Sequence, residues 1–261
     1  MKLRAPNAVT VRLAQGQPVI ADITAASVPE RFRGRPKLDS SHCPDGCSAC
    51  VDACPTHAVS LNPLTVDLGA CVFCPLCSEA CPEDAITFTN DYKIAATSRG
   101  ALLLREGGEI SPEGCTQEIQ RVFGRSLKLR SVSAGGCNGC ELELNAFGNV
   151  NFDMGRFGIE FVASPRHADG IVLSGSTTRN MEQALASTYE AIPAPKLVIL
   201  FGACAISGGI FQGSDHLARK YLEQLKIDLY IPGCPPHPLT FICGLLTYLR
   251  KTRVGSKVGN L

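Results

Sequence analysis

The sequence contains no apolar run long enough to cross a lipid bilayer. Its longest run, from Pro238 to Leu249, has about twelve residues, whereas a spanning helix needs about twenty. The first residues carry charges, but no apolar segment typical of a secretory signal follows, and there is no twin-arginine start. We therefore expect a chain that works in the reducing cytoplasm.

A strong net charge is also absent. The 25 lysines and arginines balance 24 acidic residues, for a formal net charge of +1, which by itself indicates no partner. Basic residues do gather at the two ends, which could bind nucleic acid, acidic lipid or an acidic protein, or could be solvated. We expect them to dock on protein partners and to bind no nucleic acid. The residues are Lys2, Arg4, Arg12, Arg31, Arg33, Arg35 and Lys37 in an extended docking arm over residues 1–40, and Arg250 followed by Lys251, Arg253 and Lys257 in a basic tail over residues 251–261.

Cysteine, in contrast, is abundant, with 14 residues in a chain of 261. In a reducing compartment, clustered cysteines argue for metal ligation over disulfides. The length suggests two domains, and a hydrophobic fraction of 45% is enough for a sizeable core.

Part of the sequence is duplicated. Residues 47–59 match residues 74–86 at an offset of 27, which predicts a small pseudo-symmetric module over residues 41–92. The second copy has the cysteine spacing of bacterial ferredoxins, ending in Cys-Pro, in which the fourth cysteine ligates the other cluster. The spacing predicts two [4Fe–4S] clusters, one bound by Cys43, Cys47, Cys50 and Cys81, and the other by Cys71, Cys74, Cys77 and Cys54.

The first copy departs from this spacing by one residue. Three residues, not two, separate Cys43 from Cys47, and they form a Pro-Asp-Gly turn. The turn can bulge and keep its ligand, so whether Cys43 is a ligand stays open. A zinc-stabilised binding module is the alternative, but zinc ribbons use two CxxC pairs without a repeated Cys-Pro. Over about residues 41–90, the chain resembles the two-cluster ferredoxins.

After a connector over residues 93–125, strand and helix patterns alternate. The alternation predicts an α/β domain over residues 126–250, with helices on both faces of a parallel sheet. Short apolar strands fit burial on both sides. The expected strands are 127–133, 159–163, 170–173, 197–200 and 228–231, and the expected helices are 138–147, 179–192, 215–225 and 239–249.

Four cysteines follow three of these strands. Cys137 and Cys140 follow the first strand, Cys204 the fourth and Cys234 the fifth. Open α/β folds hold ligands at the carboxyl ends of their strands. Four thiolates there would make an all-sulfur site suited to iron–sulfur or zinc.

Four motifs of this domain carry a family resemblance. They are Gly136–Glu143 (GCNGCELE), Ala163–Asp169 (ASPRHAD), Gly202–Phe211 (GACAISGGIF) and Pro232–Pro236 (PGCPP). Together they resemble the small electron-transfer subunit of group 4 energy-converting [NiFe] hydrogenases, above all the formate hydrogenlyase type. The 20 kDa subunit of complex I is a more distant likeness. Its first two cysteines are adjacent, whereas Asn138 and Gly139 separate them here, as in the hydrogenases.

The resemblance implies a flavodoxin-like fold and one [4Fe–4S] cluster ligated by Cys137, Cys140, Cys204 and Cys234. Glu143 falls where both relatives carry a glutamate, so it is expected near the cluster or at a partner interface. A carboxylate near a helix N-terminus is also favourable by itself. The loop Ser174–Arg179 could hold a flavin phosphate at a helix start, but the resemblance implies no flavin.

These expectations combine into an electron relay of three [4Fe–4S] clusters. The implied partners are a [NiFe] hydrogenase-like large subunit that evolves or oxidises H₂, an electron-donor subunit or ferredoxin, and membrane subunits. The chain would then lie peripherally on the inner face of the cell membrane and make no bonds itself. The alternative is the same relay in a nickel-free, complex I-like oxidoreductase coupled to quinone or another acceptor.

Overall fold

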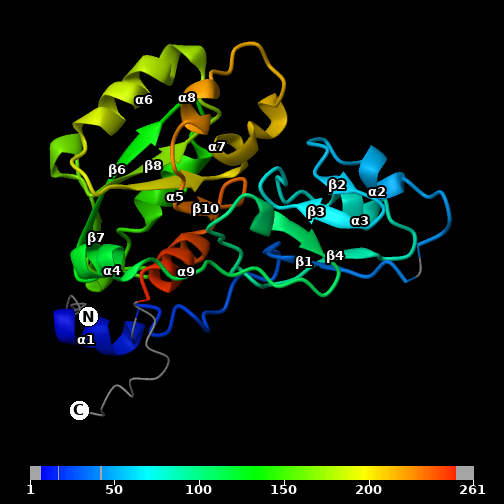
Figure 1. Ribbon diagram of the computed structural model, residues 1–261. Helices are drawn as coiled ribbons and strands as arrows, with labels where there is room; N and C mark the ends of the chain where they lie inside the picture. Colours follow the sequence, from blue (N-terminus) through cyan, green and yellow to red (C-terminus); the bar gives the residue numbers. More distant parts are fainter. Residues whose placement is uncertain (1–6, 17, 42, 251–261) are drawn as a thin grey trace, which may run out of the picture.

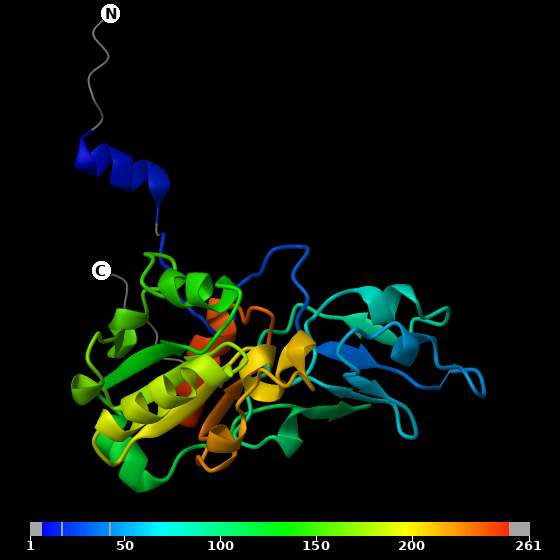
Figure 2. The same ribbon diagram turned by 90° about the horizontal axis from the view of Figure 1, so that it is seen from above.

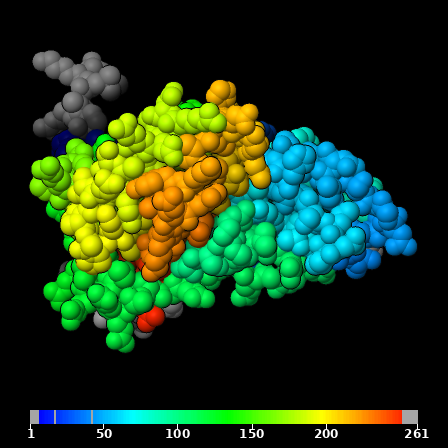
Figure 3. Space-filling model, turned by 45° about the horizontal axis from the view of Figure 1, so that its top comes forward, coloured from blue at the N-terminus to red at the C-terminus, as the bar shows by residue number. Residues whose placement is uncertain are grey.

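The computed structural model describes residues 7–16, 18–41 and 43–250. A parallel sheet with flanking helices forms one part, and two small antiparallel sheets form the other (Figure 1). Figure 3 shows the N-terminal module, blue to cyan, at one end of an elongated molecule, packed against the larger domain. Within these residues, no helix is both long and apolar enough to cross a membrane.

The larger part is built on a five-stranded parallel sheet. Its spatial order is β10-β9-β8-β6-β7, and numbered along the chain within the domain and read from β7 it is 2-1-3-4-5. This is the flavodoxin-like order, so the predicted fold class is confirmed. Both β8 and β9 are buried at every position, as their apolar sequences predict. The strands are β6 (Leu127–Ser133), β7 (Ile159–Phe161), β8 (Gly170–Ser174), β9 (Leu197–Phe201) and β10 (Leu229–Ile231).

Helices cover both faces of this sheet (Figure 1). On one face, Leu173 and Leu200 share a core with Leu185 of α6. On the other face, Phe201 packs with Phe147 and with Phe241 of α9. The α-helices of this part are α4 (Gln117–Phe123), α5 (Gly139–Ala146), α6 (Arg179–Ala191), α7 (Ala203–Ser207), α8 (Lys220–Glu223) and α9 (Pro238–Tyr248), with the 3-10 turns η2 (Met154–Phe157), η3 (Pro165–His167) and η4 (Gly209–Phe211).

The helix predicted over residues 215–225 is wrong in its first half. Residues 217 and 218 bond to the 177–179 loop instead, because Leu217 bridges Thr178 and the Ala218 amide donates to Thr177 O at 2.8 Å. Only the four residues of α8 are helical.

The smaller part contains the sequence repeat. Helices α2 (Ala49–Asp52) and α3 (Leu76–Glu79) are equivalent at the predicted offset. Its sheets extend beyond the predicted range 41–92: β1 (Pro36–Leu38) pairs with β4 (Ile86–Phe88), and β5 (Leu103–Arg105), after the turn η1 (Gly100–Leu102), joins β2 (Val59–Ser60) and β3 (Thr65–Asp67). Strands of two or three residues are too short for independent stability, so they take partners from the flanking sequence.

The expectation of an extended arm over residues 1–40 is wrong for its start. Residues Ala8–Gln15 form helix α1, because the Asn7 side chain accepts the Thr10 amide at 2.8 Å as an N-cap. Figure 2 shows α1 standing away from the body, and none of its residues is buried. From residue 18 the arm runs along the α/β domain, where the Ile20 amide donates to Asn151 O at 3.0 Å and Cys243 Sγ donates to Ile23 O at 3.1 Å. Residues 1–6 and the basic tail 251–261 lie outside the described residues.

Candidate iron–sulfur centres

The four cysteines of the α/β domain lie at the carboxyl edge of its sheet. Cys137 is in the turn between β6 and α5, Cys140 begins α5, Cys204 is on α7 directly after β9, and Cys234 follows β10. Burial raises the pKa of the Cys140 thiol to about 12, and the nearby Glu141 carboxylate and the other three thiols contribute to the same shift. Cys137 and Cys234 are exposed, so this group of thiols reaches the molecular surface.

Glycine backbone lies against these sulfurs. A Cβ atom built on Gly202 would come within 2.9 Å of Cys140 Sγ, and one on Gly209 within 3.1 Å of Cys204 Sγ. Gly202 also has φ 95° and ψ 156°, a conformation nearly exclusive to glycine. The loops can therefore pass close to the thiols without side chains filling the space between them.

The eight cysteines of the smaller part form two further groups. Burial raises the pKa of Cys50, and partial desolvation raises the pKa of Cys43 although its side chain is exposed; in both cases the charge of Cys81 adds to the shift. Cys47 likewise raises the pKa of Cys43. The structure thus places Cys43 close to Cys47 and Cys81 despite the inserted residue.

The second group surrounds Cys71. Burial raises the pKa of this thiol to about 12, with contributions from Cys77, Cys54 and Cys74. Burial also raises the pKa of Cys77 to about 11, and Cys74 and Cys54 again add to it. The thiols that influence one another here come from both copies of the repeat, and that each set of four binds one cluster stays a prediction.

Backbone amides donate hydrogen bonds to three of these sulfurs. Ala58 N lies 3.2 Å from Cys54 Sγ, and Ala85 N lies 3.2 Å from Cys81 Sγ. These two bonds are related by the 27-residue repeat, so both copies fold alike around the cysteine that precedes proline. Phe73 N donates to Cys71 Sγ at 3.3 Å. Such bonds favour the thiolate form and tune iron–sulfur potentials.

The donor set can be compared with two kinds of metal site. All fourteen cysteines are free thiols. Among the described residues, no three or more His, Cys, Asp or Glu side chains are close enough to hold one metal ion. An iron–sulfur cluster makes a different demand, because each of its four thiolates binds a separate iron atom. The glycines against the sulfurs of the α/β-domain group, and the amides directed at Cys54, Cys71 and Cys81 in the smaller part, fit that demand.

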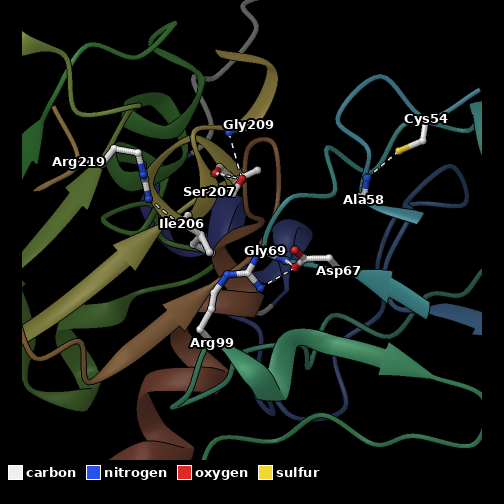
Figure 4. Close-up of polar contacts among 10 residues, drawn as sticks. Cys54, Ala58, Asp67, Gly69, Arg99, Ile206, Ser207, Gly209 and Arg219 are labelled. Atoms are coloured by element: carbon white, nitrogen blue, oxygen red, sulfur yellow. Dashed lines mark hydrogen bonds and ion pairs between the residues drawn. The ribbon is translucent and has the colours of Figure 1, made fainter. Parts of the chain in front are cut away.

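Two contacts join the second group to the α/β domain. The charge of Cys74 contributes, after burial and Cys137, to the raised pKa of Cys234, and Val72 and Phe73 of the loop between Cys71 and Cys74 line one pocket together with Cys234. A Cβ atom on Gly69, two residues before Cys71, would lie 2.7 Å from Ile206 Cγ2 on α7. Next to this contact, both guanidinium nitrogens of Arg99 bond the Asp67 carboxylate (Figure 4).

The sequence did not indicate the roles of Glu141 and Arg219, two polar residues beside the α/β-domain cysteines. Ser174 Oγ donates to Glu141 Oε1 at 2.6 Å, which fixes the carboxylate next to Cys140. The Arg219 guanidinium donates to Cys204 O and Ala205 O, and also to Ile206 O, the bond drawn in Figure 4. No spacing in the sequence marks either residue. For Glu143, which the resemblance marks, burial raises the pKa of its half-exposed carboxyl.

The loop Ser174–Arg179 packs on the cysteine loop. Thr178 N donates to Ala134 O at 3.0 Å, and a Cβ atom on Gly135 would lie 2.4 Å from Thr178 Cγ2. This loop therefore supports the turn that carries Cys137.

Two protein families and several known proteins are similar to parts of this chain. The family described as "NADH ubiquinone oxidoreductase, 20 Kd subunit" matches residues 137–248, and the "4Fe-4S binding domain" matches residues 64–87. A probable membrane-bound hydrogenase subunit of Pyrococcus furiosus is 35% identical over 134 residues, or 51% of this chain and 80% of that protein.

Two further relatives represent the two kinds of complex. An NADH-quinone oxidoreductase subunit of Bacteroides thetaiotaomicron is 41% identical over 134 residues, covering 51% of this chain and 67% of the relative. Formate hydrogenlyase subunit 7 of Escherichia coli is 42% identical over 120 residues, covering 46% and 47% of the two chains. The resemblance drawn from the four motifs is confirmed. The chain therefore belongs to the family of the 20 kDa subunit of NADH ubiquinone oxidoreductase, and a 4Fe-4S binding domain precedes the family domain in its sequence.

Proposed function

We propose that this chain is the electron-transfer subunit of a membrane-associated oxidoreductase and relays electrons to or from a [NiFe] hydrogenase-like large subunit. The observation that carries the proposal is the gathering of twelve cysteines, from segments far apart in the sequence, into three groups of four. The similarity to hydrogenase subunits supports it.

The three groups would hold three [4Fe–4S] clusters. Each cluster supplies one-electron transfer when bound. The chain's own residues position the thiols, donate amide hydrogen bonds to Cys54, Cys71 and Cys81, and keep water from the buried sulfurs. The proposed ligand sets are Cys43, Cys47, Cys50 and Cys81; Cys54, Cys71, Cys74 and Cys77; and Cys137, Cys140, Cys204 and Cys234.

The pocket that Cys234 shares with the loop between Cys71 and Cys74 supports an order for the path. Electrons would cross between the second group and the α/β-domain group at this point. The first group, with Cys43 exposed, would be the end that exchanges electrons with a donor subunit or ferredoxin.

The α/β-domain group would face the large subunit. Exposed apolar side chains follow its cysteines, with Leu142 at 62% and Ile210 at 62% exposure. Apolar side chains beside an exposed thiol group suit a protein interface. Glu143, half-buried on the same helix as Leu142, would lie at its margin. This contact and the membrane subunits would hold the chain peripherally on the inner face of the membrane.

We propose a division of the chain at the connector over residues 93–125. The ferredoxin-like module and the α/β domain would each hold their own clusters, so that one could be emptied without the other.

The function is tested by anaerobic purification of the chain together with the proteins that accompany it. We expect about twelve irons per chain, four for each cluster, and brown absorbance. A large partner subunit should contain nickel, and the complex should evolve H₂ from a reduced low-potential dye. A colourless chain containing zinc would refute the relay.

The similarity to an NADH-quinone oxidoreductase subunit favours a second candidate, the same relay in a nickel-free complex coupled to quinone or another acceptor. Twelve irons without nickel or H₂ evolution would select it. Reduction of a quinone analogue by the same preparation, lost on iron removal, would then be expected.

A further inference from the structure

The Arg219 side chain caps the C-terminal end of α7, the helix that carries Cys204. Helix α7 has only five residues; Cys204 O accepts the amide of the C-cap residue Gly208 at 2.9 Å, and the carbonyl groups that follow it lie in the last turn, where helical partners run out. Arg219 Nη1 donates to Cys204 O at 3.2 Å, and Nη2 donates to Ala205 O at 3.0 Å and Ile206 O at 2.8 Å. One side chain from a distant segment thus fixes three consecutive residues, including the proposed ligand.

The charge of Arg219 is not neutralised by an ion pair. Among the described residues, no carboxylate lies within 4.0 Å of its guanidinium, whereas nearby Arg99 is paired with Asp67. Burial lowers the pKa of Arg219, and Arg99 lowers it further while Glu223 opposes the shift. A guanidinium nevertheless stays protonated in proteins. A fixed positive charge therefore lies against the backbone of Cys204.

We propose that Arg219 is a positioning residue that also raises the redox potential of the cluster held by Cys137, Cys140, Cys204 and Cys234. This inference rests on the proposed function. Reduction adds one negative charge to a site that already has four thiolates. A nearby positive charge stabilises the reduced state more than the oxidised state, and the effect is strong where burial limits screening.

The position of Arg219 also matters for the path between the domains. Ile206, one of the three residues whose carbonyls it binds, packs on Gly69 of the ferredoxin-like module (Figure 4). Arg219 therefore fixes the face of α7 that meets the loop of Cys71. A higher potential at the α/β-domain cluster draws electrons across this contact toward the large subunit.

The test is an anaerobic redox titration followed by electron paramagnetic resonance, on the holoprotein with its partner. In Arg219→Met, the ratio of reduced to oxidised α/β-domain cluster at a fixed potential should fall about tenfold, equivalent to a midpoint about 59 mV lower. Arg219→Lys keeps the charge but has fewer donors, so its midpoint should stay close to that of the native chain while its thermal stability falls. Lys220→Met removes the adjacent exposed charge and should leave the midpoint unchanged.

Each result of these titrations either supports the proposal or overturns it. An unchanged midpoint in Arg219→Met, or equal lowering in the methionine and lysine variants, would overturn the proposal. If Arg219→Met fails to hold the cluster, the neutral variant Arg219→Gln, which keeps amide donors for the carbonyl groups, is measured by the same criterion. Loss of the cluster in both neutral variants would leave only an anchoring role and overturn the effect on potential. A native chain without iron would refute the proposed function instead.

Discussion

Substitution of Gly202 by alanine should remove one cluster of the three. Gly202 lies between β9 and α7 with φ 95° and ψ 156°, where any other residue is strained by about 1–3 kcal/mol. Its added Cβ atom would also lie 2.9 Å from Cys140 Sγ, closer than van der Waals contact allows. The strain therefore falls directly on a thiol of the α/β-domain group.

The backbone strain and the clash with Cys140 both disfavour the native arrangement of the four thiols. Strain at the middle of the range lowers the free energy of unfolding by about 2 kcal/mol. The clash displaces Cys140 or tilts α7, which carries Cys204, so the four thiols no longer match a cluster. Iron content should fall from about twelve to about eight per chain, while the spectroscopic signals of the ferredoxin-like pair persist.

Iron analysis and thermal unfolding of anaerobically purified protein measure both effects. Gly100→Ala is the matched control, because its Cβ atom would meet no atom within 4 Å. The control should keep all its iron and its unfolding temperature. A Gly202→Ala protein with about twelve irons and unchanged stability would contradict the placement of Gly202 against Cys140.

Three other changes probe separate parts of the structure. Cys204→Ser should remove or convert the α/β-domain cluster and leave about eight irons in the ferredoxin-like pair; loss of all iron would show that the domains do not load independently. Gly69→Val should lower the free energy of unfolding by about 1–3 kcal/mol through overpacking against Ile206, and unaltered thermal unfolding would count against that junction. Burial raises the pKa of Asp228 above 3.8, so its contribution to stability is greatest below pH 3.8 and is lost as the pH rises through the folded-state pKa. Asp228→Asn should therefore raise the unfolding temperature at pH 8, with a gain that shrinks on acidification; an equal gain at every pH would refute the charge argument.

Many strand positions in the α/β domain could be predicted because each depends on a run of apolar residues that are consecutive in the sequence. The predicted strand over residues 127–133 has the bounds of β6, and the apolar runs of β8 and β9 are found within one residue. For the cysteines of the smaller part, the repeat predicts that the fourth ligand of each set comes from the other copy, and this assignment stays a prediction.

The features that could not be predicted depend on contacts between distant segments. Strands β1 and β5 are each three residues long and exist through pairing with β4 and β3. Residues 217 and 218 left the predicted helix because the 177–179 loop offered hydrogen bonds. Arg219 acts through three carbonyl groups that no sequence spacing reveals.

The basic arm illustrates how such contacts change an interpretation. Its charges predicted docking on another protein, but Arg35 pairs with Asp91 at 3.1 Å, and Arg33 Nε donates to Phe73 O at 2.6 Å. Phe73 lies between Cys71 and Cys74, and the same arm contacts the α/β domain through Ile23 O. Residues 18–38 thus tie the loop of the second cysteine group to the domain that carries the third. Electron transfer depends on a fixed separation between centres, so in the proposed relay this arm would hold the ferredoxin-like module and the α/β domain together. Within the described part of the arm, α1 has no buried residue and is available to contact another protein.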